Sequence, residues 1–552
     1  MKRFFSLVIV VLLAISATAF AITADELDRN IKDTHTSFYR EFFENIFYKQ
    51  FAKFLRMDRL AGEITKHPAL DVNVYYEVPD SGFFVNRQGK QPLSQSELVR
   101  GSAKGSGPNP AGPWTVIKGK MEGVSIGLFI EDDKGDRYLL KFDPKDYPEM
   151  TTSAEIIAHK FFHAFGYHIA EYYLVEFKPE ILNADPKATY YNDDGFQKPL
   201  TQDALDAFID RMPKMKGGLI RTSASKLLKN VQGHMLFEDR KPGDPEDLVP
   251  HEARRSIRGM RVFGSWMNHY DLREGNTLDV IEEENGNAFV KHYLIDFGAT
   301  LGSASFRPKV PVAGHEHIVD WYEVGKTAPT LKVVEKPWEK KWDTLHRQIA
   351  SPAIGYFDNL QFDPGDWKTQ LPYEVFSRLT ISDAFWAAKI IMSFSNEDID
   401  AIVASAKFSD PEDTKTMASI LAARRNLIGA YWFSRSTPLD KIELSEAGNQ
   451  AYQIKFEDLN VKHHLVAEND PVYQFKAEFL SANGKKTEAD FQKFSSSSFS
   501  IQPPSTDVVR ITVWVRARYG ANGSWSEPPL KITLAKTQDD FPFSIVEIDH
   551  GV

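Results

Sequence analysis

The chain has 552 residues, of which 42% are hydrophobic and 26% are charged, so it has an ordinary globular composition and is long enough for about three domains. Its formal net charge of −10 argues against nucleic acid as the main partner. The absence of cysteine excludes disulfides, thiolate metal sites and a cysteine nucleophile.

Residues 1–21 have the three-part order of a secretory signal. Two basic residues precede an apolar run from Phe4 to Ile15, and Ala19-Phe20-Ala21 supplies the small residues of a cleavage site. We expect cleavage after Ala21 and a mature protein that is exported, either periplasmic or extracellular. No other run approaches the roughly 18 apolar residues that a membrane span needs, so we predict no membrane span.

The next segment, residues 22–110, is predicted to be an extension of helical and extended structure. Apolar residues recur at helical spacing between Ser37 and Leu60, which predicts a helix with one packed face. An extended aromatic segment follows over residues 72–87. Residues 101–113 have the composition of a linker, so a domain boundary is placed near residue 110.

From Trp114 the pattern is typical of strands, which we predict over residues 115–118, 124–131 and 137–143. Lys141 lies in the third strand between two apolar residues. A helix is predicted over residues 151–165, and it carries Glu155. Three glycines spaced four residues apart, Gly119, Gly123 and Gly127, lie around the turn between the first two strands. Their backbone amides can close over phosphate groups, or the glycines can simply permit a hairpin.

A strand over residues 169–177, a polar insertion to about residue 216 and a strand over residues 219–228 come next. A helix is then predicted from Pro250 to about Met267. Its spacing predicts that Arg254, Arg255 and Arg258 point outward and that Ile257, Met260, Phe263 and Trp266 point inward.

Two phrases after this helix carry chemistry. Residues 269–276 have the spacing H-x-D-x-x-x-x-N, with Asp271 and Asn276 at its key positions, and Asp296-Phe297-Gly298 follows. Runs of β-forming residues between them, around a turn at residues 285–287, predict a hairpin that brings Asn276 and Asp296 to the same end. The alternative is a plain hairpin, in which Asp271 is a turn residue and Asp296 ends a strand.

Together with the order of strand lysine, helix glutamate and helix before the loop, these phrases resemble the protein-kinase-like superfamily. No Ala-Pro-Glu phrase follows, so the resemblance is to the atypical branch that includes secretory-pathway kinases. It implies that ATP and Mg²⁺ or Mn²⁺ are the cofactors.

The resemblance also implies a role for each site residue. Lys141 would hold phosphates, Glu155 would hold Lys141, and Asp271 would orient or deprotonate the acceptor hydroxyl. Asn276 and Asp296 would bind metal, and His269 would be structural. The glycines Gly119, Gly123 and Gly127 would help to bind nucleotide, although they depart from the G-x-G-x-x-G pattern.

Towards the C-terminus, helices are predicted over residues 382–406 and 411–433. Strands are predicted over residues 452–456, 473–480, 508–519 and 530–534. Residues 510–534 resemble the last two strands of a fibronectin type III module, so a β-sandwich is expected. Its expected task is to bind a partner protein or to act as a spacer.

The predicted fold is α+β, with a signal at 1–21, an extension at 22–110, a two-lobed kinase-like domain at 111–437 and an all-β sandwich at 438–552. The favoured function is ATP- and Mg²⁺-dependent phosphoryl transfer to a hydroxyl of a protein or small molecule. Two alternatives stay open at this point. One is a pseudokinase that serves as a nucleotide-binding scaffold, and the other is nucleotidyl transfer by the same fold.

Overall fold

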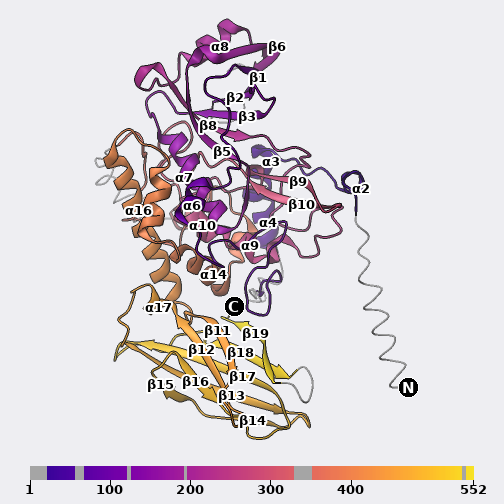
Figure 1. The fold of residues 1–552 in the computed structure, drawn as a ribbon, viewed down its shortest axis with the longest axis vertical. Coiled ribbons are helices and arrows are strands. Elements are labelled where there is room, and N and C mark those ends of the chain that lie inside the picture. The colour runs from indigo at the N-terminus through magenta and orange to yellow at the C-terminus, as the bar shows by residue number, and fades with distance from the viewer. Residues whose placement is uncertain are drawn as a thin grey trace.

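The computed structural model describes residues 22–55, 67–120, 126–191, 196–327, 338, 351–536 and 542–551 (Figure 1). The predicted secretory signal, residues 1–21, and Gly123 lie outside these ranges. In Figure 1 a β-sheet lies at one end of the molecule, helices occupy the middle, and a second β region lies at the other end.

The N-terminal extension is helical where it was expected to be. The predicted helix is present from Phe38 to Leu55, and residues 56–60 lie outside the description. It consists of α3 (Phe38–Phe43), a π-helical turn η1 (Glu44–Tyr48) and α4 (Lys49–Leu55). Ile46 is buried, but Phe47 and Phe51 are exposed, so the predicted apolar face packs only in part. Among the described residues of the extension, α2 (Ala24–Asn30) and α6 (Gln95–Arg100) are further helices.

The first sheet has seven strands in the order β5-β8-β3-β2-β1-β6-β7. The three predicted strands are confirmed as β1 (Trp114–Lys120), β2 (Gly127–Glu131) and β3 (Arg137–Phe142). The others are β5 (Tyr172–Phe177), β6 (Leu182–Tyr191), β7 (Gln197–Pro199) and β8 (Ile220–Lys226). The polar insertion extends this sheet through β6 and β7 and adds η2 (Pro179–Ile181), α8 (Gln202–Ile209) and η3 (Lys216–Gly218).

Helix α7 (Met150–Phe165) follows β3 and contacts β3, β5 and β8 of this sheet. Almost all of its residues are buried, because the sheet covers one side and the helical region covers the other. It therefore joins the sheet to the rest of the core.

A small second sheet has the order β4-β10-β9, formed by β4 (His168–Ile169), β9 (Thr277–Glu284) and β10 (Asn287–Leu294). The predicted hairpin is confirmed, with Thr277 opposite Leu294. Asn285 and Gly286 both have positive φ, as a tight two-residue turn requires. The two ends of the hairpin, and the residues that flank them, are thus neighbours.

Helices form the middle of the molecule and share one large apolar core with α7 and the extension. The bounds are η4 (His251–Ala253), α9 (Arg255–Arg258), α10 (Met260–Trp266), η5 (Glu274–Asn276), α11 (Trp321–Thr327), α13 (Glu374–Ser377), α14 (Ile381–Met392), α15 (Asn396–Ala404) and α16 (Pro411–Phe433). The predicted helix over 382–406 is therefore two helices, because Ser395 caps the start of α15.

The predicted helix over 250–267 differs from the structure in two respects. It is divided into η4, α9 and α10, and the extended backbone of Arg254 separates η4 from α9. The prediction that Arg254, Arg255 and Arg258 point outward is wrong, because they are 7%, 0% and 1% exposed. Arg255 and Arg258 both contact the buried carboxylate of Asp383, so the helix is charged on its inner side.

The C-terminal region has two antiparallel sheets around its own apolar core. One has the order β11-β12-β16, and the other has the order β14-β13-β17-β18-β19, with β15 paired to β13. All four predicted strands are present. The bounds are β11 (Leu439–Glu446), β12 (Tyr452–Asp458), α17 (Leu459–Lys462), β13 (Pro471–Ser481), β14 (Lys486–Glu488), β15 (Gln492–Phe494), β16 (Ser498–Ile501), β17 (Val508–Tyr519), β18 (Leu530–Lys536) and β19 (Phe543–Asp549).

The predicted α+β class with a C-terminal all-β sandwich is confirmed. Within the ranges given above, none of the helices is long and apolar enough to cross a membrane.

Candidate active site

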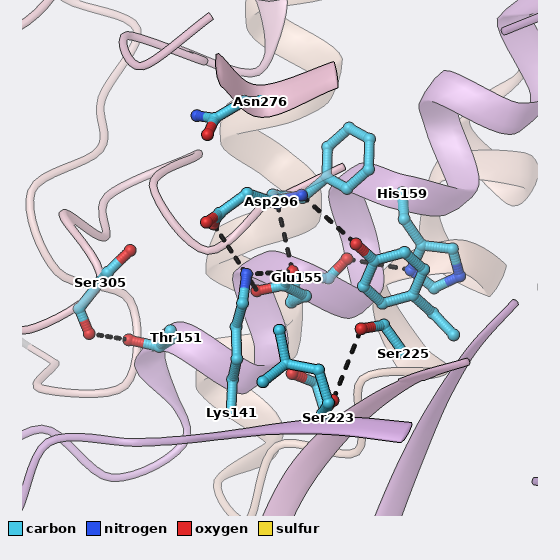
Figure 2. Close-up of polar contacts among 12 residues, drawn as sticks. Lys141, Thr151, Glu155, His159, Ser223, Ser225, Asn276, Asp296 and Ser305 are labelled. Carbon is cyan, nitrogen blue, oxygen red and sulfur yellow. Dashed lines mark hydrogen bonds and ion pairs between the residues drawn. The ribbon is translucent and has the colours of Figure 1, made fainter. Parts of the chain in front are cut away.

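Lys141 is the centre of an ionic cluster between the first sheet and the helical middle. Its ammonium lies 3.0 Å from Glu155 Oε1 on α7 and 2.7 Å from Asp296 Oδ1, as Figure 2 shows. The Lys141 and Glu155 side chains are 4% and 0% exposed. Burial disfavours the charged ammonium, but the two carboxylates outweigh burial and raise the pKa of Lys141. The lysine is therefore held as a cation.

The start of α7 is fixed to the end of β3 by Asp143. This buried carboxylate accepts hydrogen bonds of 2.8 Å from the backbone N–H groups of both Thr151 and Thr152. These are donors of the first helical turn, which have no partner within the helix. Because Asp143 lies two residues after Lys141, the contact sets the distance between Lys141 and Glu155.

The Asp296-Phe297-Gly298 phrase lies against the same glutamate. Asp296 has a φ of 61°, a backbone region that aspartate tolerates better than most residues. The Phe297 N–H donates to Glu155 Oε1 at 3.2 Å. A Cβ on Gly298 would lie 2.8 Å from Glu155 Oε2, so glycine is required for this close approach. The phrase thus fits around Glu155 through its backbone.

The loop over residues 269–276 lies next to Asp296. The Ile295 N–H donates to the Asn276 carbonyl at 3.0 Å, which ties the loop to the strand that ends at Asp296. The Asn276 Nδ2 donates to the carbonyl and the carboxylate of Asp271 at 2.8 and 2.9 Å. Burial raises the pKa of Asp271 to about 6, with Arg273 opposing the rise. A carboxyl with such a pKa can accept a proton near neutral pH.

His269 is buried between the aromatic rings of Phe162 and Phe297, with centroid distances of 5.6 and 5.7 Å. Burial lowers its pKa to about 3, so it is neutral. This environment agrees with the structural role expected for it.

The glycines of the first hairpin are placed differently. Gly119 lies inside β1, and a Cβ there would lie 2.8 Å from Tyr190 Cβ on β6, so its small size is explained by packing. Gly127 begins β2 and pairs with Lys141. Gly123 lies outside the described residues. A nucleotide-binding role of the three glycines stays a prediction.

The side chains of this site can be compared with the ligands that a divalent metal ion needs. Among the residues described, no group of three or more His, Asp or Glu side chains is arranged to hold a metal. Asn276 and Asp296 lie one above the other in Figure 2. Because Asn276 uses its Nδ2 twice on Asp271, its Oδ1 is left to act as a ligand atom. One carboxylate and one amide oxygen suit Mg²⁺, which takes its other ligands from phosphates and water.

The structure brings together five of the predicted residues: Lys141, Glu155, Asp271, Asn276 and Asp296. Their catalytic and metal-binding roles stay predictions. Asp143 was missed because its contact crosses a loop, and ordinary capping signals lie directly before a helix. Glu41 on α3, which contacts the loop, was also missed, and no local pattern around it indicates such a contact.

No family model matches the chain, and no curated protein sequence matches it significantly. Solved structures that it resembles include the proinflammatory kinase CtkA of Helicobacter pylori, at 14% identity over 56% of this chain and 94% of that chain, with a TM-score of 0.27. The Golgi casein kinase is similar at 8% identity over 74% of this chain and 92% of that chain, with a TM-score of 0.28. Its form with Mn/ADP bound gives 8%, 72% and 89%, with a TM-score of 0.29.

TM-scores of this size do not carry an argument, so the class of the protein rests on its own geometry. Lys141 on the first sheet is paired with Glu155 on a helix, and the loop at 269–276 and the Asp-Phe-Gly phrase flank one hairpin. This is the two-lobed, kinase-like arrangement that the sequence predicts.

Proposed function

We propose that the protein is an exported phosphotransferase that uses ATP with Mg²⁺ or Mn²⁺ to phosphorylate a hydroxyl of a protein or a small molecule. The observation that carries the proposal is the convergence on Lys141: its ammonium contacts Glu155 and Asp296, from two other elements. Asp271 and Asn276 are hydrogen-bonded to each other beside this cluster. Phosphoryl transfer needs such a set: a cation for the phosphates with a carboxylate that orients it, a carboxylate for the acceptor, and a further carboxylate with an amide for the metal.

Each residue has a distinct task in this proposal. Lys141 binds phosphate oxygens. Glu155 keeps the lysine oriented, because its buried carboxylate accepts from the Lys141 ammonium and is itself held by the Phe297 N–H. Asp271 faces the acceptor hydroxyl and takes its proton. Asn276 and Asp296 would hold the divalent ion, which when bound supplies positive charge against the phosphates.

The test of the proposal compares two aspartates with unlike tasks. Asp296→Ala should weaken binding of Mg²⁺-ATP, whereas Asp271→Ala should leave binding nearly unchanged and lower turnover by about a hundred- to ten-thousand-fold. Calorimetric titration of Mg²⁺-ATP measures the first effect. Release of ADP, measured with water and with the protein itself as acceptor, measures the second.

The products separate the proposal from its alternatives. ADP together with a phosphorylated acceptor supports phosphotransfer, whereas pyrophosphate together with a nucleotide-modified acceptor indicates nucleotidyl transfer. Binding of Mg²⁺-ATP without any product indicates a scaffold. If the wild type binds no nucleotide with either metal, the proposal fails.

Two further parts of the proposal concern the ends of the chain. Export rests on the order of residues 1–21 and is tested by N-terminal sequencing of the mature protein, which should begin at Ile22. Retention of Met1 in a cytosolic protein would contradict it. The C-terminal sandwich is proposed to be fibronectin type III-like and to bind a partner protein. Affinity capture by the sandwich, compared with capture by the rest of the chain, tests that role.

A further inference from the structure

Glu41, on α3 of the N-terminal extension, lies more than two hundred residues before the loop at 269–276 but touches it directly. Its Oε1 accepts hydrogen bonds of 3.0 Å from the Gly275 N–H and from Arg273 Nη1. Its Oε2 accepts a hydrogen bond from the Tyr373 hydroxyl. Glu41 is 0% exposed. A buried carboxylate is costly unless it is hydrogen-bonded and paired, so these three donors explain why it is tolerated.

Arg273 connects Glu41 to the proposed catalytic carboxylate. Its Nη1 contacts Glu41, and its Nε lies 3.2 Å from Asp271 Oδ1. A guanidinium has donors in a fixed planar fork, so fixing one edge orients the other. Phe38, one turn before Glu41 on α3, also lies under Arg273, with its ring centroid 5.6 Å from Cζ. The face of α3 that carries Phe38 and Glu41 therefore holds Arg273 in place.

The loop is shaped to receive this carboxylate. A Cβ on Gly275 would lie 2.1 Å from Arg273 Nη1 and 2.6 Å from Glu41 Oε1, so any other residue there would disturb the pair of Arg273 with Glu41. Burial raises the pKa of Glu41, and Arg273 opposes the rise. The Gly275 N–H can donate to Oε1 in either protonation state, so this hydrogen bond holds the loop whether or not Glu41 is charged.

We infer that Glu41 is a positioning residue, which holds Arg273 and the peptide at Gly275 so that Asp271 faces the acceptor. This inference rests on the proposed phosphotransfer. Residues 38–55 would then complete the active site, rather than being an appendage that merely packs against the core. Asn45 supports this arrangement, since its Nδ2 donates to the Glu41 carbonyl at 2.9 Å within the π-helical turn.

The same extension offers a matched control. Lys49 on α4 forms an ion pair of 2.9 Å with Glu238, and Lys53 forms one of 2.5 Å with Glu374. Both pairs attach the extension to the core through residues outside the loop at 269–276. Lys53→Met removes the second of them, and Glu374 keeps its ion pair with Arg378 at 3.3 Å. It tests whether weaker attachment alone changes catalysis.

The experiment measures kcat for ADP release and the affinity for Mg²⁺-ATP in the full chain. Glu41→Ala should lower kcat by on the order of ten- to a hundred-fold, because a small misplacement of a catalytic group is enough for that loss. Its affinity for Mg²⁺-ATP should stay within about twofold, because Lys141 and Asp296 keep their places. Glu41→Gln keeps an acceptor for the Gly275 N–H and should recover most of the rate.

Hydrogen exchange supplies a readout beside activity. In Glu41→Ala, amide protection of residues 271–276 should fall, whereas Lys53→Met should keep both the protection and the rate of the wild type. If Glu41→Ala does not fold, Glu41→Asp takes its place, because its shorter side chain cannot reach Gly275 and Tyr373 together.

The outcomes separate this inference from the proposed function. A wild type that turns over, with an unchanged kcat in the Glu41 variants, overturns the role of Glu41 and leaves phosphotransfer intact. Equal losses in Glu41→Ala and Lys53→Met overturn it too, because they indicate loosened packing. A wild type that binds nucleotide without turnover overturns both.

Discussion

The kinase-like core and the C-terminal sandwich use charge in opposite ways. In the core, Lys141, Arg255 and Arg258 are all buried and meet buried or half-buried carboxylates. In the sandwich, between residues 439 and 549 as far as they are described, Asp458 is the only Asp, Glu, Lys or Arg classed as buried. Its core is formed by apolar side chains from both sheets, and the other polar side chains buried there are uncharged, such as Gln474 and Thr533.

The two regions also differ in the position of the cationic side chains that lie over aromatic rings. Lys476 and Arg516 lie over Trp514 and Phe491 on the outer face of the sandwich. Arg254 instead lies over the buried ring of Phe83 inside the core. The sandwich is therefore stabilised mainly by alternation of apolar and polar residues, whereas the core depends on paired charges that must stay satisfied.

The largest expected difference between the regions appears in acid. Burial lowers the pKa of His168 to about 4 and that of His269 to about 3, and it lowers the pKa of His159 well below the usual 6.5. The unfolded chain takes up these protons near pH 6.5, so unfolding is increasingly favoured as the pH falls from there towards 4. Each buried histidine then costs on the order of 2 kcal/mol at pH 5.

In the C-terminal region burial lowers the pKa of His463 to about 4 and that of His550 to about 3. The core has more such histidines, with His163 and His317 in addition to the three named above, so it should lose more stability in acid than the sandwich does. Urea unfolding at pH 7.5, 6 and 5 checks this prediction, with tryptophan fluorescence for the whole chain and hydrogen exchange to separate the regions. Equal loss of stability in both regions between pH 7.5 and 5 would contradict it.

A smaller but local effect is expected from Asp383, which lies in the capping box of α14 and binds Arg255 and Arg258 at 3.0 and 3.3 Å. Asp383→Ala leaves two buried guanidinium groups without their carboxylate. We expect a loss of about 3–5 kcal/mol in the free energy of unfolding, as when one partner is removed from a buried ion pair.

Asp398 is the matched control, because it has the same place in the capping box of α15 and its side chain accepts from the Ser395 N–H at 2.9 Å. Asp398→Ala should cost only the roughly 0.5–2 kcal/mol of a lost cap. Similar losses in the two variants, measured by urea unfolding, would show that the buried arginines contribute little.

The same difference between the two regions explains which elements and residues could be predicted from the sequence. The strands of the sandwich were predicted where alternation is long, as in β13 and β17. Strands β11, β14, β15, β16 and β19 were missed. Three or four residues do not establish a period in β14, β15 and β16, and β11 and β19 each bury only two residues and do not alternate regularly. In the core, Lys141, Glu155 and Asp296 were predicted together because their order along the chain is distinctive.

The inward arginines of α9 could not be predicted in the same way. Periodicity places charge outside by default, and the carboxylate that brings Arg255 and Arg258 inside lies more than a hundred residues away, at Asp383. Glu41 was missed for the same reason, since its partners lie beyond residue 270. Local patterns specify elements well, but they say little about which distant charges will meet.

The smallest expected effect on stability comes from a substitution in the core of the sandwich. Ile532 on β18 is 0% exposed and belongs to the apolar core shared by the two sheets. Ile532→Val removes one methylene and should cost about 0.5–1.5 kcal/mol. We expect only the unfolding transition of the sandwich to shift, because the region has its own apolar core. Its contacts with the rest of the chain include the ion pair of Lys389 with Asp440 at 3.0 Å, the hydrogen bond from the Ile548 N–H to the Val74 carbonyl at 2.8 Å and the ring contact of Phe385 with His550 at 4.4 Å. Lys531→Val, at the neighbouring outward position, should change stability by less than about 1 kcal/mol, since its pair with Glu547 is exposed to solvent.

Thermal unfolding followed by calorimetry resolves the two transitions. A single transition that shifts as a whole in Ile532→Val would mean that the Lys389 contact and its neighbours couple the two regions into one cooperative unit. The difference between their interiors would then not appear as two separate unfolding transitions.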